Sequence, residues 1–219
     1  MENKTVVLID DHQIFIQGLK IIIERYEGYS VVGDAGSIQA GAELIGKVLP
    51  NIAIVDLNLG NEDGLDLIKL IKKNYPDVLV IVLSMLDERH YAERSLLAGA
   101  RGYIMKEETA EVLFDAMEAV CAGKVWMSEQ QRSRYLDAMF SAGNKAEKGM
   151  QPLVQKLSDR QLAILSLMGK GFGSIPISEK LSISPKTVEA HKAQLKKKLG
   201  CSSAQELLRF AIDWVGRNQ

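Results

Sequence analysis

Three aspartates, a serine and a lysine stand where short apolar runs of this chain end. They are Asp10, Asp11, Asp56, Ser84 and Lys106. Crowded carboxylates repel one another, and a bound cation offsets that repulsion. Oxygen ligands suit Mg²⁺ rather than zinc or copper. A carboxylate beside Mg²⁺ and a lysine ammonium can attack a phosphoryl group, because both cations stabilise the phosphoryl oxygens. The residue types therefore predict phosphoryl transfer onto an aspartate.

These residues meet only if the apolar runs are strands of one sheet. The runs are nearly continuous in Val, Ile and Leu, as strands buried on both faces are. We expect strands at Thr5–Asp10, Tyr29–Ala35, Asn51–Leu57, Asp77–Ser84 and Ala100–Lys106. Helical spacing alternates with them, at Gln13–Glu27, Ile38–Leu49, Leu65–Asn74, Glu88–Ala98 and Ala110–Ala122. Such repeats predict a doubly wound α/β fold, a five-stranded parallel sheet whose strand ends converge on one edge.

Residues 1–125 resemble the receiver domain of bacterial two-component response regulators, which has a flavodoxin-like fold. The resemblance lies in four motifs: Asp10-Asp11, Asp56-Leu57-Asn58-Leu59 followed by Gly64, Ser84-Met85, and Gly102-Tyr103-Ile104-Met105-Lys106. It implies that Asp56 is the phosphoacceptor. A sensor histidine kinase or a small acyl phosphate would donate the phosphoryl group.

The resemblance also implies how Mg²⁺ is held. Asp11 and Asp56 would be direct ligands, Asp10 would act mainly through a bound water, and Asn58 would supply its backbone carbonyl. One departure is Gly60, where the family usually carries proline. This departure loosens the loop after Asp56 and removes no ligand.

Three further residues take roles from the resemblance. Ser84 would hydrogen-bond the new phosphoryl group, Lys106 would pair with its oxygens, and Tyr103 would change rotamer on activation. His12 follows the acidic pair, and we interpret it as the start of the first helix rather than as a ligand.

A haloacid-dehalogenase-like phosphatase also places an aspartate nucleophile beside Mg²⁺. Such enzymes usually carry a second aspartate two residues later, on the first strand. Here position 58 is Asn, and Asp56 ends the third expected strand. Without that general acid, a lasting acyl phosphate suits a signal better than a catalyst. We therefore expect a regulator and not an enzyme.

Charge is divided unevenly along the chain. Residues 150–219 contain 11 Lys and Arg against 5 Asp and Glu, a net charge of +6, whereas residues 1–149 carry −7. An acidic module joined to a basic one is typical of proteins with a nucleic-acid-binding domain. The N-terminus lacks the layout of a signal peptide, and Cys121 and Cys201 are too few for a disulfide framework. We expect a cytoplasmic protein.

The last 65 residues carry only helical signals. Ser158 or Asp159 caps a helix through Met168, a short helix runs from about Ser174 to Leu181, Ser184-Pro185 starts a third, and Ser202 or Ser203 caps the last. Two short helices joined by a tight turn predict a helix-turn-helix, the second helix of which enters the DNA major groove.

The segment from Lys186 to Gly200 is similar to the LuxR-type recognition helix, and with Leu157-Ser-Asp-Arg160 the match covers about residues 155–216. A receiver followed by this module is the layout of the NarL/FixJ subfamily. The implied DNA contacts begin at Lys186. Thr187, His191, Lys192 and Lys196 would lie near phosphates, and Glu189, Ala190 and Ala193 would face base edges. The predicted organisation is a receiver at 1–125, a linker with a helix at 126–154 and a DNA-binding domain at 155–219.

Two departures bear on the output of this domain. Pro176 lies in the short helix, which must therefore begin no earlier than Gly173 or Ser174. Gln161 replaces the usual Glu. Both changes put DNA affinity in doubt, so a degenerate domain that binds proteins is the alternative function. The main prediction is a transcriptional regulator that binds promoter DNA as a homodimer once phosphorylated.

Overall fold

The computed structural model describes residues 3–60, 62–133, 154, 157–181 and 183–217. The chain divides into two compact units, residues 1–139 and 140–219. Of the linker with a helix predicted at 126–154, residues 126–133 and 154 are described, and residues 129–133 are helical.

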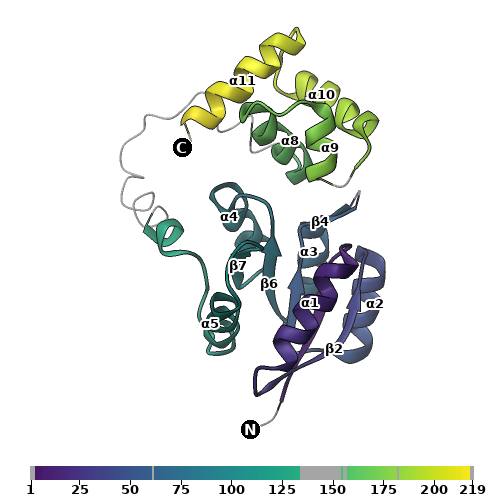
Figure 1. Ribbon diagram of the computed structural model, residues 1–219, viewed down its shortest axis with the longest axis vertical. Coiled ribbons are helices and arrows are strands. Elements are labelled where there is room, and N and C mark those ends of the chain that lie inside the picture. Colours follow the sequence, from purple (N-terminus) through teal and green to yellow (C-terminus); the bar gives the residue numbers. More distant parts are fainter. Residues whose placement is uncertain (1–2, 61, 134–153, 155–156, 182, 218–219) are drawn as a thin grey trace. The chain divides into compact units, whose positions relative to one another are not determined.

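The first unit is built on a five-stranded parallel sheet (Figure 1). Its strand order is β2-β1-β3-β6-β7, and all four strand pairs are parallel. The strands are β1 (Lys4–Ile9), β2 (Tyr29–Ala35), β3 (Ile52–Val55), β6 (Leu79–Ser84) and β7 (Gly102–Met105). The predicted doubly wound α/β sheet is confirmed.

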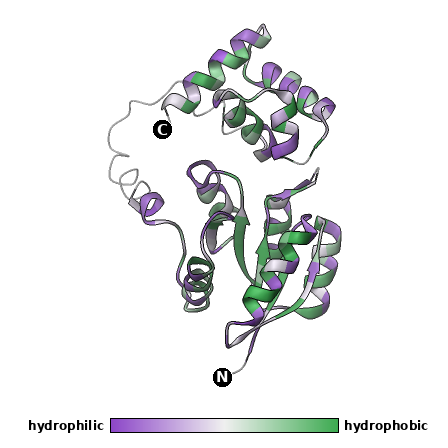
Figure 2. Ribbon diagram, viewed as in Figure 1, coloured by the Kyte–Doolittle hydropathy of each residue, from purple (hydrophilic) through white to green (hydrophobic). Residues whose placement is uncertain are grey.

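Helices cover both faces of this sheet. They are α1 (Gln13–Glu24), α2 (Ile38–Val48), α3 (Gly64–Asn74), α4 (Glu88–Ala98) and α5 (Ala110–Cys121). One core joins α1 and α5 to the sheet through residues such as Ile16, Leu113 and Met117. Strand β6 is apolar along most of its length, and the helices have apolar and polar sides (Figure 2). The burial of both sheet faces explains why the strands are near-continuous in aliphatic residues.

A short hairpin follows β3 and was not predicted. Its strands are β4 (Asn58–Leu59) and β5 (Glu62–Asp63), which pair antiparallel. Gly64 begins α3 directly after it, and its N–H donates to the carbonyl of Leu57 at 2.9 Å. A Cβ at Gly64 would lie 2.2 Å from the carbonyl oxygen of Asp56. The absence of a side chain therefore lets the hairpin fold back against the strand end that carries Asp56.

The segment after α5 lies along the outer edge of the sheet. Trp126 forms a parallel bridge with Gly102, donating to the carbonyl of Arg101 at 2.9 Å and accepting from Tyr103 at 3.1 Å. The hydroxyl of Ser128 then donates to the carboxylate of Glu88, in the first turn of α4. The edge strand β7 is thus paired on its outer side.

Among its described residues, the second unit has four helices with assigned bounds. They are α8 (Asp159–Gly169), α9 (Ser174–Lys180), α10 (Pro185–Lys198) and α11 (Ala204–Arg217). Their shared core includes Leu165, Ile177, Val188 and Leu195, all fully buried. Among the described residues, no helix has the length and apolar character needed to cross a membrane.

Candidate acidic site and candidate nucleic-acid interface

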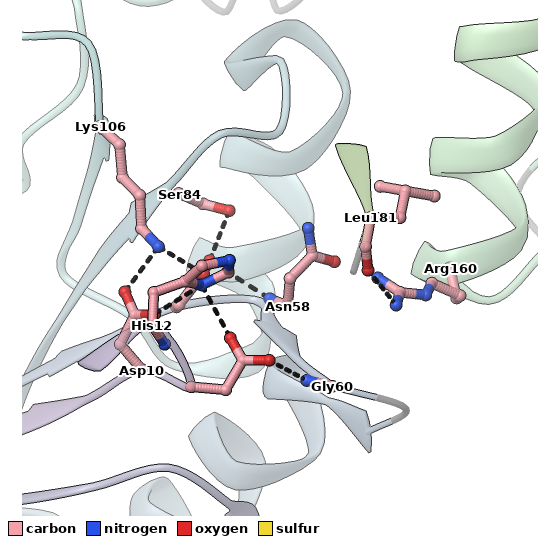
Figure 3. Close-up of polar contacts among 10 residues, drawn as sticks. Asp10, His12, Asn58, Gly60, Ser84, Lys106, Arg160 and Leu181 are labelled. Atoms are coloured by element: carbon pink, nitrogen blue, oxygen red, sulfur yellow. Dashed lines mark hydrogen bonds and ion pairs between the residues drawn. The ribbon is translucent and has the colours of Figure 1, made fainter. Parts of the chain in front are cut away.

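Asp56 follows directly after β3 and is 3% exposed. Its two carboxylate oxygens are held by groups from other strand ends (Figure 3). The hydroxyl of Ser84 donates to Oδ1 at 2.8 Å, and the ammonium of Lys106 donates to Oδ2 at 2.7 Å. The backbone N–H of Asn58 also donates to Oδ1, at 3.2 Å. The carboxyl ends of parallel strands lie at one edge of the sheet, so these polar groups are brought together there.

Lys106 links two of the aspartates. Its Nζ lies 2.5 Å from Asp10 Oδ2 as well as 2.7 Å from Asp56 Oδ2, and its side chain is 6% exposed. Burial alone would lower the pKa of Lys106, but the carboxylates of Asp56 and Asp10 outweigh it and raise that pKa. Burial raises the pKa of Asp56 against the opposing effect of Lys106. The lysine stays charged and only partly offsets the buried carboxylates.

Asp11 presents an oxygen suited to a cation. Its Oδ2 accepts from the N–H of Gly60 at 2.9 Å, and its buried Oδ1 lies 2.9 Å from Nδ1 of His12. Gly60 has φ of +60°, which proline cannot adopt, and proline would lack the donating N–H. The departure at residue 60 thus adds a contact that orients Asp11.

His12 belongs to this cluster, although sequence reasoning set it aside. Its Nδ1 lies 3.0 Å from Asp10 Oδ1 and 2.9 Å from Asp11 Oδ1. One ligand atom from each of Asp10, Asp11, His12 and Asp56 falls within 4.8 Å of the others. The sequence feature that could have identified His12 as a member of the cluster is its position directly after Asp10 and Asp11. Carboxylate oxygens gathered this closely fit a hard divalent cation such as Mg²⁺.

Tyr103 is connected to this site by hydrogen bonds through the loop after β6. Its hydroxyl is buried and donates to the carbonyl of Leu86 at 2.7 Å, and the N–H of Leu86 donates to Ser84 Oγ at 3.4 Å. Ser84 in turn contacts Asp56. A change at the Asp56 carboxylate therefore has a continuous route to Tyr103, which lies beside Trp126 on the sheet edge.

Local sequence explains where α10 begins and which side faces outward. Ser184 caps the helix by accepting from the N–H of Thr187 at 3.0 Å, and Pro185 occupies the first helical position. Val188 and Leu195 are fully buried, as expected from their spacing. The exposed residues of this helix include Lys186, Glu189, Ala190, Ala193 and Lys196, and Thr187 is half-buried.

Two residues expected at phosphates are more enclosed. The side chain of Lys192 is 20% exposed, and its ammonium donates to Ser174 and to Glu189. His191 is half-buried, and its Nδ1 is buried without a hydrogen bond in the described part of the chain. Burial, with a smaller effect of the nearby Arg160 charge, lowers the pKa of His191. His191 is therefore neutral at neutral pH.

Comparisons with known proteins match each of the two units to a family. The family described as response regulator receiver domain matches residues 6–118, and the bacterial regulatory proteins of the luxR family match residues 155–211. The chain belongs to the LuxR-type response regulators. It is 36% identical over 208 residues to the transcriptional regulatory protein MctR of Rhizobium johnstonii, covering 95% of this chain and 92% of that protein.

Two further relatives extend the comparison. Oxygen regulatory protein NreC of Staphylococcus aureus is 32% identical over 211 residues, covering 94% of this chain and 96% of that protein. The structure of RcsB from Salmonella enterica serovar Typhimurium, bound to a promoter in the presence of the phosphomimetic BeF₃⁻, is 29% identical with a TM-score of 0.59. That match covers 96% of this chain and 98% of RcsB. This response regulator is a phosphorylation-controlled, DNA-binding regulator of transcription.

The structure accounts for both departures in the output domain of this response regulator. Ser174 begins α9 with Gly173 as its cap, so Pro176 lies in the first turn, where its missing N–H leaves no helical bond unmade. Gln161 is buried and completes a capping box with Ser158, donating also to Gln194 at 2.9 Å. The neutral Gln161 therefore still orders the start of α8 and fastens α10 to it.

Substitution of Gln161 should show how much its contacts stabilise the packing of α8 against α10. Gln161→Ala removes the capping contact, the bond to Gln194 and the acceptor of Lys198, which lies 2.8 Å from Oε1. We expect the free energy of unfolding of the second unit, measured by thermal unfolding, to fall by about 1–3 kcal/mol. Gln161→Glu keeps the shape and the acceptor for Lys198, so it should unfold within a few degrees of the parent. Equal losses in both variants would contradict this role.

Proposed function

We propose that Asp56 is the phosphoryl acceptor of this response regulator. The observation that carries the proposal is the hold on both Asp56 oxygens by Ser84 and Lys106. A carboxylate oxygen would attack the phosphorus of a phosphohistidine on a sensor histidine kinase, the P–N bond would break, and the histidine nitrogen would take up a proton. Ser84 and Lys106 would then stabilise the phosphoryl oxygens. The transfer would modify the protein itself, so the protein would act as a regulator and not as an enzyme.

Mg²⁺ is the proposed cofactor. Asp11 and Asp56 would be direct ligands, Asp10 would act through water and Asn58 through its carbonyl. The ion supplies positive charge that offsets clustered carboxylates and developing phosphoryl charge. The closeness of Asp11 to the other members of the cluster, with ligand atoms within 4.8 Å of one another, supports a ligand role for that residue. The role of Tyr103 as the switch is proposed from its hydrogen-bonded connection to Ser84.

The second unit is proposed to read double-stranded promoter DNA through α10. Lys186, Thr187 and Lys196 would contact phosphates, with His191 as a neutral donor, and Glu189, Ala190 and Ala193 would face base edges. We propose domain limits of 1–125 and 155–219, with residues 126–128 packed on the sheet edge of the receiver. Exposure of the named α10 side chains supports this assignment.

Homodimerisation is proposed through the outer face of α11. Leu207, Leu208, Ala211 and Val215 recur at helical spacing along α11, but they do not share one side of it. Ala211 is fully buried and belongs to the core, whereas Leu208 and Ile212 are 41% and 50% exposed. These two stand four residues apart and form one apolar ridge. This exposed pair is the proposed dimer contact.

Ile212→Glu should weaken the dimer. Two like charges would meet across a twofold contact, so sedimentation with beryllofluoride should show at least a tenfold weaker dimer than the parent. Ile175→Glu, the same change at an isoleucine that is 64% exposed on α9, is the matched control and should dimerise normally. An unaltered dimer in Ile212→Glu would move the contact to another surface.

A further inference from the structure

The start of α9 is joined to the outer face of α10 by a small polar cluster. Ser174 and Lys192 both donate to Oε1 of Glu189, and the ammonium of Lys192 also donates to Ser174. In the sequence, Ser174 lies 15 positions before Glu189 and 18 positions before Lys192. We define them as the Ser174 cluster. It lies within the helix-turn-helix and includes a residue proposed to face base edges.

The cluster changes what Lys192 can do. Its side chain is 20% exposed, and its ammonium already has two acceptors, whereas Lys186 and Lys196 on the same helix are exposed. A phosphate contact by Lys192 would require these bonds to break. It would also leave Glu189 as an unneutralised charge close to the DNA backbone. The geometry therefore disfavours Lys192 as an ordinary phosphate contact.

Glu189 is the member of the cluster that remains available to DNA. Its side chain is 61% exposed. Both donors bind Oε1, so they fix the carboxylate plane while Oε2 keeps its capacity to accept. The hydrogen bond from Ser174, with a smaller contribution from Lys192, lowers the pKa of Glu189 and keeps the carboxylate charged. A charged acceptor held in one orientation loses little freedom on binding.

We propose that Lys192 and Ser174 are positioning residues that aim Glu189 at a cytosine amino group in the major groove. The inference rests on the proposed entry of α10 into that groove. A carboxylate accepts from cytosine N4, whereas guanine and thymine present only acceptors to it, and adenine places the N7 acceptor beside its N6 donor. Lys192 thus contributes to sequence preference by positioning Glu189, while Lys186 and Lys196 contribute to the affinity for DNA of any sequence.

The experiment compares full-length variants activated with beryllofluoride. Each is used to select sites from a randomised duplex library and is then titrated on the selected site and on random duplex over a salt series. Lys192→Met keeps the apolar stem and should lose the cytosine preference at one position of each half-site. Its ratio of specific to random affinity should fall about tenfold. Its log–log salt slope should stay at the parent value. Ser174→Ala should behave in the same way, and Ser174→Thr should restore the preference.

Lys196→Ala is the matched control, because it removes an exposed lysine of the same helix. It should weaken specific and random binding alike, with a salt slope smaller by about 0.9. If Lys192→Met gives that result and keeps its base preference, Lys192 is a phosphate contact and the inference is overturned. If Glu189→Ala keeps the preference, the proposed base reading by Glu189 fails instead. Loss of preference in Glu189→Ala alone, and not in Lys192→Met or Ser174→Ala, refutes the positioning role only.

Discussion

Asp56→Ala is expected to abolish phosphoryl incorporation from acetyl phosphate. The parent protein with Mg²⁺ should gain one phosphoryl group, detected as a single mass increment by intact-protein mass spectrometry. The variant lacks the attacking oxygen, and Asp10, which also contacts Lys106, does not receive the hydrogen bond that Ser84 donates to Asp56. Chelation of Mg²⁺ should abolish labelling of the parent as well, because the lysine charge alone does not offset three clustered carboxylates.

The fold should survive this substitution. Burial raises the pKa of Asp56, so its charge is held in the folded state at a cost, and Asp10 still pairs with Lys106 in the variant. Thermal unfolding should therefore show an unchanged or higher transition temperature. Asp66→Ala, at an exposed aspartate of α3, is the matched control and should be labelled normally. Undiminished labelling of Asp56→Ala would contradict the assignment of Asp56 as the phosphoryl acceptor.

Ala211→Glu is expected to unfold the second unit. Ala211 is fully buried where α11 meets α8, and the contact is so close that a Cβ at Gly169 would lie 2.4 Å from the Ala211 carbonyl oxygen. A carboxylate there must be desolvated without a partner, which costs several kcal/mol and rivals the whole stability of a small domain. Circular dichroism should show loss of helix at 25 °C.

The neighbouring position provides the contrast. Ile212→Glu places the same side chain on the exposed side of α11, and its transition temperature should stay within a few degrees of the parent. Together the two variants separate core packing from dimerisation on a single helix. A cooperatively folded Ala211→Glu protein would show that α8 and α11 can move apart, contrary to the packing described.

Most of the fold could be predicted because its signals are local. Runs buried on both faces identify the strands, and caps such as Ser158 and Ser184 identify helix starts. The convergence of Asp56, Ser84 and Lys106 follows from parallel topology alone. Observed strands are shorter than expected at several ends. For example, β3 ends at Val55, because the chain leaves the sheet there and enters the hairpin at Asn58.

Other features depend on contacts that no local pattern records. The position of His12 between two carboxylates depends on its rotamer at the start of α1, and the Ser174 cluster depends on the packing of α9 against α10. Helical spacing identified α11 as amphipathic, yet it could not decide that Leu207 faces inward and Leu208 outward. Such choices are settled only when a second element covers one side.

The pairing of Trp126 with β7 has a consequence for how this protein can be divided or recombined. A receiver fragment that ends with α5 would leave the outer N–H and C=O groups of β7 uncovered, and uncovered edge strands invite pairing between molecules. It would also lose the contact of Ser128 with Glu88 at the start of α4. Chimaeras that graft a new output onto this receiver should therefore be joined after Ser128, so that the inherited tail shields the sheet from self-association.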